Sequence, residues 1–468
     1  MGVRASGTLP AIGTSAGMPG GVGRRTAIVD VSLAHWTLSL SGLALYLWVI
    51  HSFRLNVGAI GVGLALLGLL TRPGSLTFPL PTLAFGAWLA WSTGIGLATS
   101  DHPSLVLTSM VEFTKILAVF VVVANVTRAP QQLLLFIATW LAIFVAYPLR
   151  GQMVYLAANQ QFKGRYGWNF NFSNFNDFAS FDILIIGMAG YVALAPIAPR
   201  YRKLAVAVLG GALLSFLLTQ SRGAGLAVAL TLPLYLSRSR HRTRIVAVLG
   251  MLVAAIVIAF PGKVFTRIMD ISITKSAAER DMYNEADASA EQRIRIAEVA
   301  FAVFKSSPLT GIGIGAYERA HGLMAETRAE WNIARGDRDA HNLYLRILAE
   351  TGVVGFALFG AMIVGTMRIA SRREKQLRVV DPSGAEQLRI LRYCLVAYML
   401  SGFFGSFYKW AYMYMYLAIM ISAAGIQWPR SGGVAAAPTI AGPAPASRRR
   451  WLQQPRRVAA SRRAPRPA

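Results

Sequence analysis

Cysteine and charge are both scarce in this 468-residue chain. Cys394 is the single cysteine, so no disulfide, thiolate metal site or redox pair can be built within one chain. Charged residues make up only 15% of the sequence, whereas soluble domains average about 25%. Hydrophobic residues reach 54%, and the mean hydropathy is +0.47. This balance argues against an ordinary soluble domain and indicates a chain whose main solvent is lipid.

The apolar residues fall in long runs. A helix needs roughly 17 to 25 such residues to cross about 30 Å of hydrocarbon. We therefore predict an all-α polytopic integral membrane protein with about twelve transmembrane helices. Two of the runs, 57–70 and 224–236, are short, so ten or eleven crossings remain an alternative. The predicted spans are 34–52, 57–70, 77–98, 105–124, 131–149, 177–197, 203–219, 224–236, 245–260, 343–369, 391–407 and 411–427.

Acidic residues are also scarce, with 21 Asp and Glu against 47 Lys and Arg and a net charge of +26. The position of the cations favours a membrane topology over nucleic-acid binding. Most of them fall on segments that would be cytoplasmic if the N-terminus is inside, as the positive-inside rule expects. Both termini are then cytoplasmic, and one large loop, 262–341, lies on the opposite, outer side of the membrane.

These assignments divide the chain into three parts. Residues 1–33 form a cytoplasmic disordered tail, and residues 34–427 form the transmembrane domain. Residues 428–468 form a basic disordered tail that is attracted to anionic membrane lipids. A twin-arginine signal at Arg24-Arg25 is a weaker alternative to a simple positive-inside anchor.

A short turn at 219–225 places Arg222 where a predicted span meets the outer aqueous edge. Gly223 and Gly225, which follow it, would let backbone approach a ligand closely. A guanidinium here could hold phosphate oxygens as a fixed, permanently charged fork. An arginine that only snorkels to the interface is the equally simple alternative.

The loop at 150–176 alternates aromatic rings and amides around Arg165. Aromatic faces and amide groups suit sugar rings, so this loop is a candidate glycan-binding surface. An interfacial aromatic belt explains the rings but does not require the asparagines. The candidate glycan-binding residues are Tyr166, Trp168, Asn169 and Asn171.

The long loop ends with His341 at the mouth of a predicted span. A histidine can exchange a proton near neutral pH, although a capping or interfacial role is the more common one. Arg346 and Glu350 are four residues apart, so a structural ion pair is their default interpretation. Earlier in the loop, residues 291–304 predict an amphipathic helix with Ile294, Ala297, Phe301 and Phe304 on its apolar face.

Three other features have plain alternatives to a chemical role. Asp337 and Asp339 could hold a metal, but solvation of a loop is their simpler interpretation, and we expect no metal and no cofactor. Glu112 and Lys115 could line a cavity or simply pair with each other. The glycine run 311–315 lacks the strand of a dinucleotide fold and is interpreted as a turn.

The sequence resembles the O-antigen ligase and polymerase superfamily over roughly residues 150–425. His341-Asn342 followed by Glu350-Thr351-Gly352 and Gly355 looks like its signature. Ser221-Arg222-Gly223 matches a second element, and a third extends from Arg293 to Gly315.

The resemblance implies a GT-C-like membrane glycosyltransferase at the periplasmic face of the bacterial inner membrane. It would move a glycan from undecaprenyl diphosphate to an acceptor sugar hydroxyl, without a metal and with inversion of the anomeric centre. Lipid A core or a growing polysaccharide would be the acceptor. On this chain, the implied catalytic roles fall on His341 and Arg222. Arg222 would also bind the donor diphosphate, and Arg165 is a looser match for that role.

Four functions are compatible with the sequence. The leading one is an O-antigen ligase, and a polymerase of O-antigen or exopolysaccharide is the closest rival. A protein O-glycosylation ligase is a third version of the same chemistry. A polysaccharide transporter would suit the composition, but it does not explain a long loop that carries the motif histidine.

Overall fold

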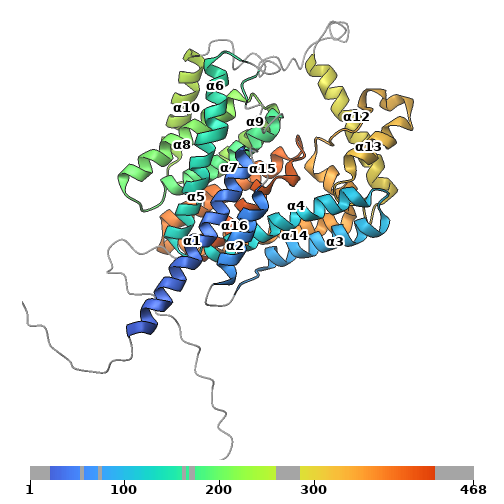
Figure 1. Cartoon of the computed structure of the whole chain (residues 1–468). Coiled ribbons are helices and arrows are strands. Elements are labelled where there is room, and N and C mark those ends of the chain that lie inside the picture. The colour runs from blue at the N-terminus through green and yellow to red at the C-terminus, as the bar shows by residue number, and fades with distance from the viewer. Residues whose placement is uncertain are drawn as a thin grey trace, which may run out of the picture. The chain divides into compact units, whose positions relative to one another are not determined.

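The computed structural model describes residues 22–52, 57–71, 76–160, 165–167, 174–259 and 285–426. Every predicted span that falls in this part of the chain is helical (Figure 1). Among the described residues, five helices are long and apolar enough to cross a membrane by length and composition, which is consistent with a polytopic membrane protein. They are Pro103–Val126, Pro130–Ala157, Phe175–Ala193, Pro199–Leu218 and Leu343–Val380.

The N-terminal half supplies most of the membrane-like helices. Its first helix begins at Val22, within the segment that we expected to be a disordered tail. Pro148, which has no N–H to donate, lies in a π-helical turn that joins two helices into one long span. The helices are α1 (Val22–Ser52), α2 (Gly58–Leu70), α3 (Leu80–Thr99), α4 (Pro103–Val126), α5 (Pro130–Phe144), η1 (Val145–Leu149), α6 (Arg150–Ala157), α7 (Phe175–Ala193), α8 (Pro199–Leu218), α9 (Arg222–Leu236) and α10 (Arg242–Ala259).

The rest of the described chain forms a small helical unit and three further long or buried helices. The small unit belongs to the loop that we predicted at 262–341, of which residues 262–284 lie outside the described part. Its helices are α12 (Glu285–Ser306), α13 (Tyr317–Glu326) and η3 (Ala329–Ala334). The helices that follow are α14 (Leu343–Val380), α15 (Pro382–Ser401), η4 (Phe407–Lys409) and α16 (Ala411–Gly425).

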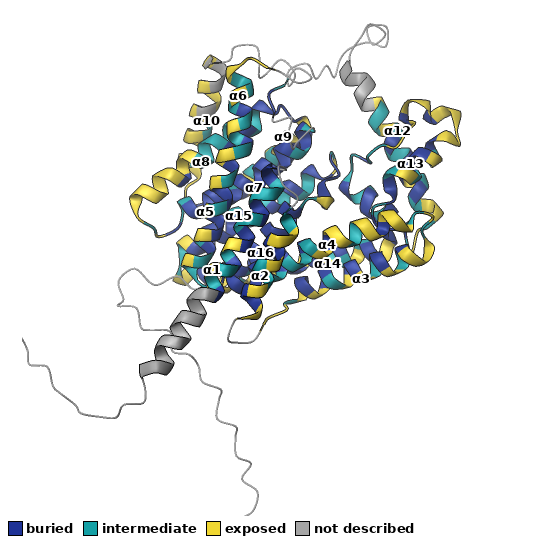
Figure 2. Cartoon of the chain, viewed as in Figure 1, coloured by how far each residue is buried: buried dark blue, intermediate teal, exposed yellow. Residues whose placement is uncertain are grey.

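Two helices with apolar residues on every side lie at the centre of the bundle. Almost all of α7 and α16 is buried, as Figure 2 shows, whereas the described apolar side chains of α10 are mostly exposed and those of α8 are mostly exposed or half-buried. A helix that is hydrophobic on every side is found either in a protein core or in contact with lipid. The pair α7 and α16 fits the first case, and the pair α8 and α10 fits the second. Around the core, α15 packs against α7, α9 and α14, and α3 packs against both α4 and α14.

The small unit has its own apolar core, and its orientation differs from our prediction. The buried face of α12 consists of Ile296, Val299, Ala300 and Val303, which pack with Tyr317 and Trp331. The predicted apolar face was wrong in this respect, because Ile294 is 60% exposed and Phe301 is 45% exposed. The last predicted spans also needed adjustment, because α14 continues to Val380 and α15 begins at Pro382, nine residues before 391.

The glycines near the end of the loop have a structural explanation. Gly352 interrupts α14 with a φ of 65°, and this kink frees backbone groups to bond with the turn at 308–313. The N–H groups of Ile312 and Gly313 donate to the carbonyls of Ala349 and Glu350, both at 3.0 Å. The N–H of Val353 donates to the carbonyl of Pro308 at 2.9 Å. The turn predicted at 311–315 is therefore anchored on α14.

Candidate functional site

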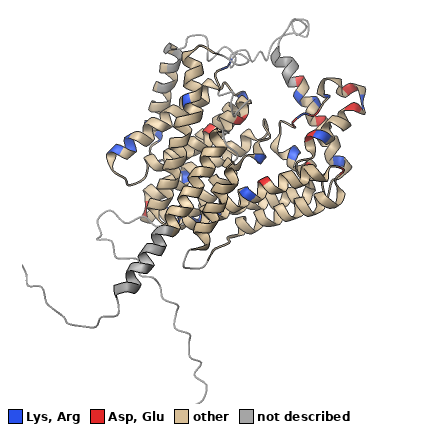
Figure 3. Cartoon of the chain, in the orientation of Figure 1, with Lys and Arg blue, Asp and Glu red and all other residues tan. Residues whose placement is uncertain are grey.

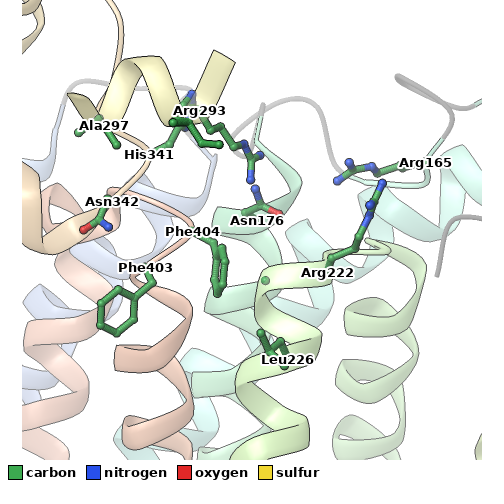
Figure 4. A pocket seen from close by; sticks show the side chains of 13 residues that line it. Arg165, Asn176, Arg222, Leu226, Arg293, Ala297, His341, Asn342, Phe403 and Phe404 are labelled. Carbon is green, nitrogen blue, oxygen red and sulfur yellow. The ribbon is translucent and has the colours of Figure 1, made fainter. Parts of the chain in front are cut away.

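A pocket of about 470 Å³ lies where the small unit meets the ends of several long helices (Figure 4). This volume falls in the usual range of roughly 300–1,000 Å³ for ligand pockets. The lining residues are Arg165, Asn176, Arg222, Gly223, Leu226, Arg293, Ile294, Ala297, Ala340, His341, Asn342, Phe403 and Phe404. Three of the residues singled out by sequence, Arg165, Arg222 and His341, are therefore brought together here.

Arg222 is the first residue of α9, and the start of that helix is firmly fixed. Ser221 is the N-cap, and its hydroxyl accepts from the N–H of Ala224 at 3.4 Å. The same hydroxyl donates to Oδ1 of Asn176 at 2.7 Å, which ties α9 to α7. A Cβ at Gly223 would lie 2.5 Å from Phe404, so a glycine lets this ring sit directly against the helix.

Arg293 is a third arginine in the pocket, and our site prediction missed it. It reaches in from α12, on the opposite side from Arg222, as Figure 4 shows. Burial lowers the pKa of Arg293, and the positive charge of Arg222 lowers it further. Its neighbours Ile294 and Ala297 also line the pocket. A helix face that carries both a cation and apolar residues was therefore the sequence signal that could have identified Arg293 as a pocket residue.

Arg165, Arg222 and Arg293 all line this pocket. None of the described residues that line the pocket is Asp or Glu. Among described carboxylates, none lies within ion-pair distance of Arg222 or Arg293. Like charges that converge in a partly dehydrated pocket are costly unless an anion joins them. The pocket is thus arranged for an anionic ligand, and guanidinium groups suit phosphate oxygens best.

His341 lies at the other side of the pocket, just before α14. Its φ is 50°, an uncommon value for a residue with a side chain. Asn342 caps α14 by accepting from the N–H groups of Tyr344 and Leu345, and its own N–H donates to Ser406 at 3.0 Å. The strong cap fixes the backbone directly after His341, which therefore projects from a rigid point.

Asp339 lies behind the imidazole. Its Oδ2 is 3.6 Å from Nδ1 of His341, and it also accepts from the backbone N–H of His341 at 3.4 Å. Burial lowers the pKa of His341, nearby arginines including Arg293 lower it further, and Asp339 opposes them by raising it. A pKa below its usual 6.5 keeps the imidazole neutral at pH 7, the form that can accept a proton.

A buried ion network holds Asp339. Arg346, only 3% exposed, pairs with Asp339, with Glu318 and, at 3.3 Å, with Glu350. The pair of Arg346 and Glu350 predicted from their spacing is therefore present, within a larger cluster. Lys409 also reaches Glu318 at 3.4 Å, and the charges of Arg346 and Lys409 together lower the pKa of Glu318 against the effect of burial.

The rings of Tyr317 and Tyr408 complete the cluster. The Arg346 guanidinium lies 5.5 Å from the Tyr317 ring centroid and 5.4 Å from that of Tyr408. The Tyr408 hydroxyl donates to Glu350. Three carboxylates against Arg346 and Lys409 leave the cluster with one net negative charge, which a protonated His341 would neutralise.

The remaining residues that we considered for the site lie outside the pocket lining or outside the described part of the chain. Tyr166 is buried and is not among the lining residues; its hydroxyl donates to Asn159 at 2.8 Å. Trp168, Asn169 and Asn171 lie outside the described residues. Glu112 and Lys115 pair at 2.6 Å, as the plainer interpretation had it.

The described acids offer no metal cluster. No group of three or more His, Cys, Asp or Glu side chains with suitable geometry occurs among the described residues. Asp337 lies 3.8 Å from Arg319, and Asp339 is engaged by Arg346 and His341. Both acids of the possible metal pair are thus occupied by cationic or titratable side chains.

The fold and the pocket define a polytopic membrane protein with a cationic pocket at the helix ends. A comparison with known families gives the particular relationship. The family model described as O-antigen ligase matches residues 205–360, which include Arg222, Arg293 and His341. This segment, about a third of the chain, is therefore similar to the O-antigen ligase family. No curated protein matches the chain.

Proposed function

We propose that the chain is an O-antigen ligase-type glycosyltransferase. It takes a glycan from undecaprenyl diphosphate and joins it to an acceptor sugar hydroxyl of lipid A core, at the periplasmic face of the inner membrane. The observation that carries this proposal is the convergence of Arg165, Arg222 and Arg293 with His341 in one pocket.

The three pocket arginines are suited to bind the diphosphate, which is the leaving group of the proposed reaction. Cleavage of a glycosyl–diphosphate bond leaves negative charge on the diphosphate, and fixed guanidinium groups stabilise that charge without reorganisation. No step of this scheme requires a metal, because the three cations supply the positive charge. Phe403 and Phe404 line the same pocket, and their faces offer a surface for sugar rings.

His341 suits the role of general base. The acceptor hydroxyl loses its proton to the imidazole as its oxygen attacks the anomeric carbon from the side opposite the diphosphate, which inverts that centre. The net negative cluster around Asp339 and Arg346 then stabilises the imidazolium. Positioned proton transfer of this kind contributes about 10²–10⁴-fold to a rate.

The test uses single substitutions of pocket arginines and the histidine. Arg222→Ala, Arg293→Ala and His341→Ala are expressed in a strain that lacks the gene, and surface polysaccharide is resolved on a gel. Arg319→Ala is the matched control, because Arg319 is an exposed arginine of the small unit that lies outside the pocket lining. We expect the three pocket variants to abolish polysaccharide attachment and the control to restore it. Normal attachment by the pocket variants would refute the site.

The same gel separates ligation from polymerisation. Loss of a ligase leaves long polymer on the lipid carrier, whereas loss of a polymerase leaves lipid A core with a single repeat unit. A transfer assay with purified protein and lipid-linked donor, run with and without a chelator, tests the metal-independent chemistry directly.

A further inference from the structure

A second cavity lies on the outer surface of the bundle between α5 and α8. It has a volume of about 620 Å³ and is almost wholly apolar. Its lining residues are Gln131, Leu134, Leu135, Ala138, Leu141, Ala142, Val145, Ala146, Val192, Ile197, Tyr201, Leu204, Ala205 and Val208. Both walls belong to helices long and apolar enough to cross a membrane, so the groove faces the lipid.

The groove has the dimensions of a lipid chain in one leaflet. From Gln131 to Ala146 a helix rises about 22 Å at 1.5 Å per residue. One leaflet offers about 15 Å of hydrocarbon and a further interfacial layer of roughly 5–7 Å. Ala138 and Ala142 lie one turn apart, and their small side chains make the groove deep. Leu204 and Val208 of α8 form part of the facing wall.

One end of the groove is cationic. Arg200 stacks on Tyr201, with its guanidinium carbon 4.7 Å from the ring centroid and its nitrogen donating to the hydroxyl at 3.0 Å. Tyr201 itself lines the groove, so this cation lies at the groove mouth. Arg202 and Lys203 share the same turn, and neither α5 nor α8 contains an Asp or Glu. Figure 3 shows Lys and Arg at this end of α8 without an acid beside them.

The cationic mouth lies at the far end of both helices from the arginine pocket. The helix that begins with α5 continues through η1 and α6 toward Arg165, and α8 ends at Leu218, shortly before Arg222. The mouth, in contrast, lies at the first turns of α5 and α8. A lipid with its headgroup at Arg200 therefore differs from a lipid whose diphosphate sits in the arginine pocket.

We propose that this groove is a binding site for one acyl chain of an anionic phospholipid, with the lipid phosphate at Arg200. Apolar length, position on a lipid-facing surface and positive charge at the mouth all fit this occupant. The site does not depend on the proposed transferase activity. A cation near the membrane surface is expected to favour an anionic over a zwitterionic headgroup by roughly five-fold.

Native mass spectrometry of the full-length protein in mild detergent tests the proposal. Phosphatidylglycerol and phosphatidylethanolamine with identical chains are titrated separately. We expect one phosphatidylglycerol to bind about five-fold or more tightly than phosphatidylethanolamine. Ala142→Phe fills the groove and should weaken both lipids by about ten-fold or more. Arg200→Gln should remove most of the preference, because it weakens phosphatidylglycerol more than phosphatidylethanolamine.

Two matched control substitutions distinguish the effects of filling the groove and of removing a charge from a general loss of stability. Ala207→Phe adds the same bulk to an exposed position of α8 outside the groove, and Arg244→Gln removes an exposed arginine elsewhere. Both should bind like the wild type. If Ala142→Phe does not fold, Ala138→Phe fills the groove one turn away. Equal affinity of the wild type for the two lipids, or equal binding by the filled variants and Ala207→Phe, would overturn the proposal.

Discussion

Asp339→Asn is the most informative single substitution in the pocket. It keeps the shape of the side chain and removes the charge behind His341. At 3.6 Å, a unit charge acts on an imidazolium with roughly 4–5 kcal/mol at an effective dielectric constant of about 20. Asp339 shares its charge with Arg346, and both Asp339 and His341 are about one-third exposed, so screening reduces this value. About 1.5–3 kcal/mol remains, which predicts a loss of roughly 10- to 150-fold in transfer rate.

The pH dependence of the transfer rate measures a second effect of Asp339→Asn. A histidine can act as a base only when it is neutral, so under the proposed role of His341 kcat/KM should rise with pH through its pKa. Because Asp339 raises that pKa, its neutral replacement lowers the pKa further. The acidic limb of the profile should therefore move to lower pH as the maximal rate falls. A purely structural role for Asp339 would lower the rate without moving this limb.

The assay is initial-rate transfer by purified protein with a lipid-linked donor, between about pH 4.5 and 8.5, a range that brackets the ordinary pKa of histidine. Asp337→Asn is the matched control, because Asp337 is two residues away and lies beside Arg319. Thermal unfolding of each variant shows whether the network around Arg346 still holds. Full activity of Asp339→Asn, an equal loss in Asp337→Asn, or a limb that moves to higher pH would refute the reasoning.

Three further predictions follow from the same geometry. Inorganic pyrophosphate should inhibit transfer competitively with the donor and less strongly as salt rises, and Arg293→Ala should weaken this inhibition by about ten-fold or more, measured as an inhibition constant. Arg222→Lys should lose most activity although it keeps the charge, because a lysine cannot hold two phosphate oxygens in a planar fork; wild-type rates would contradict this role. Gly352→Ala should lower the free energy of unfolding by about 1–3 kcal/mol or more, because Gly352 has a positive φ and a new Cβ would overlap the carbonyl of Leu309. The measurement is a lower unfolding temperature. Gly360→Ala is the control and should be neutral, because no atom lies within 4 Å of its new Cβ.

The membrane-like helices were predictable because hydropathy is a local property. The runs at 105–124 and 177–197 coincide with α4 and α7 to within a few residues. The ends of α14 and α15 were less predictable, since charged residues such as Arg389 are buried there. Arg389 pairs with Glu374 at 3.1 Å and with Glu386 at 2.5 Å. A polar helix that is stabilised by partners on another helix leaves no local hydrophobic signal.

The site was predictable only in part. Arg222 and His341 stood out because they lie next to glycines or at the end of a span, where local sequence restricts the structure. Arg293 lies in the middle of an amphipathic helix, and nothing local tells which face of α12 turns toward the pocket. Its orientation is set by the burial of Val299 and Val303 in the small unit, which is a tertiary effect.

The segment from His341 to Gly352 explains how distant parts of the chain hold one pocket. Its first residues cap α14 and present His341, whereas its last residues form the kink that receives the turn after α12. That turn follows directly from the helix that carries Arg293. The distance between His341 and this arginine is therefore set by backbone hydrogen bonds at Ala349 and Glu350, which do not line the pocket. A spacing of residues that looks like a catalytic signature thus also encodes the scaffold that aligns two sides of the site.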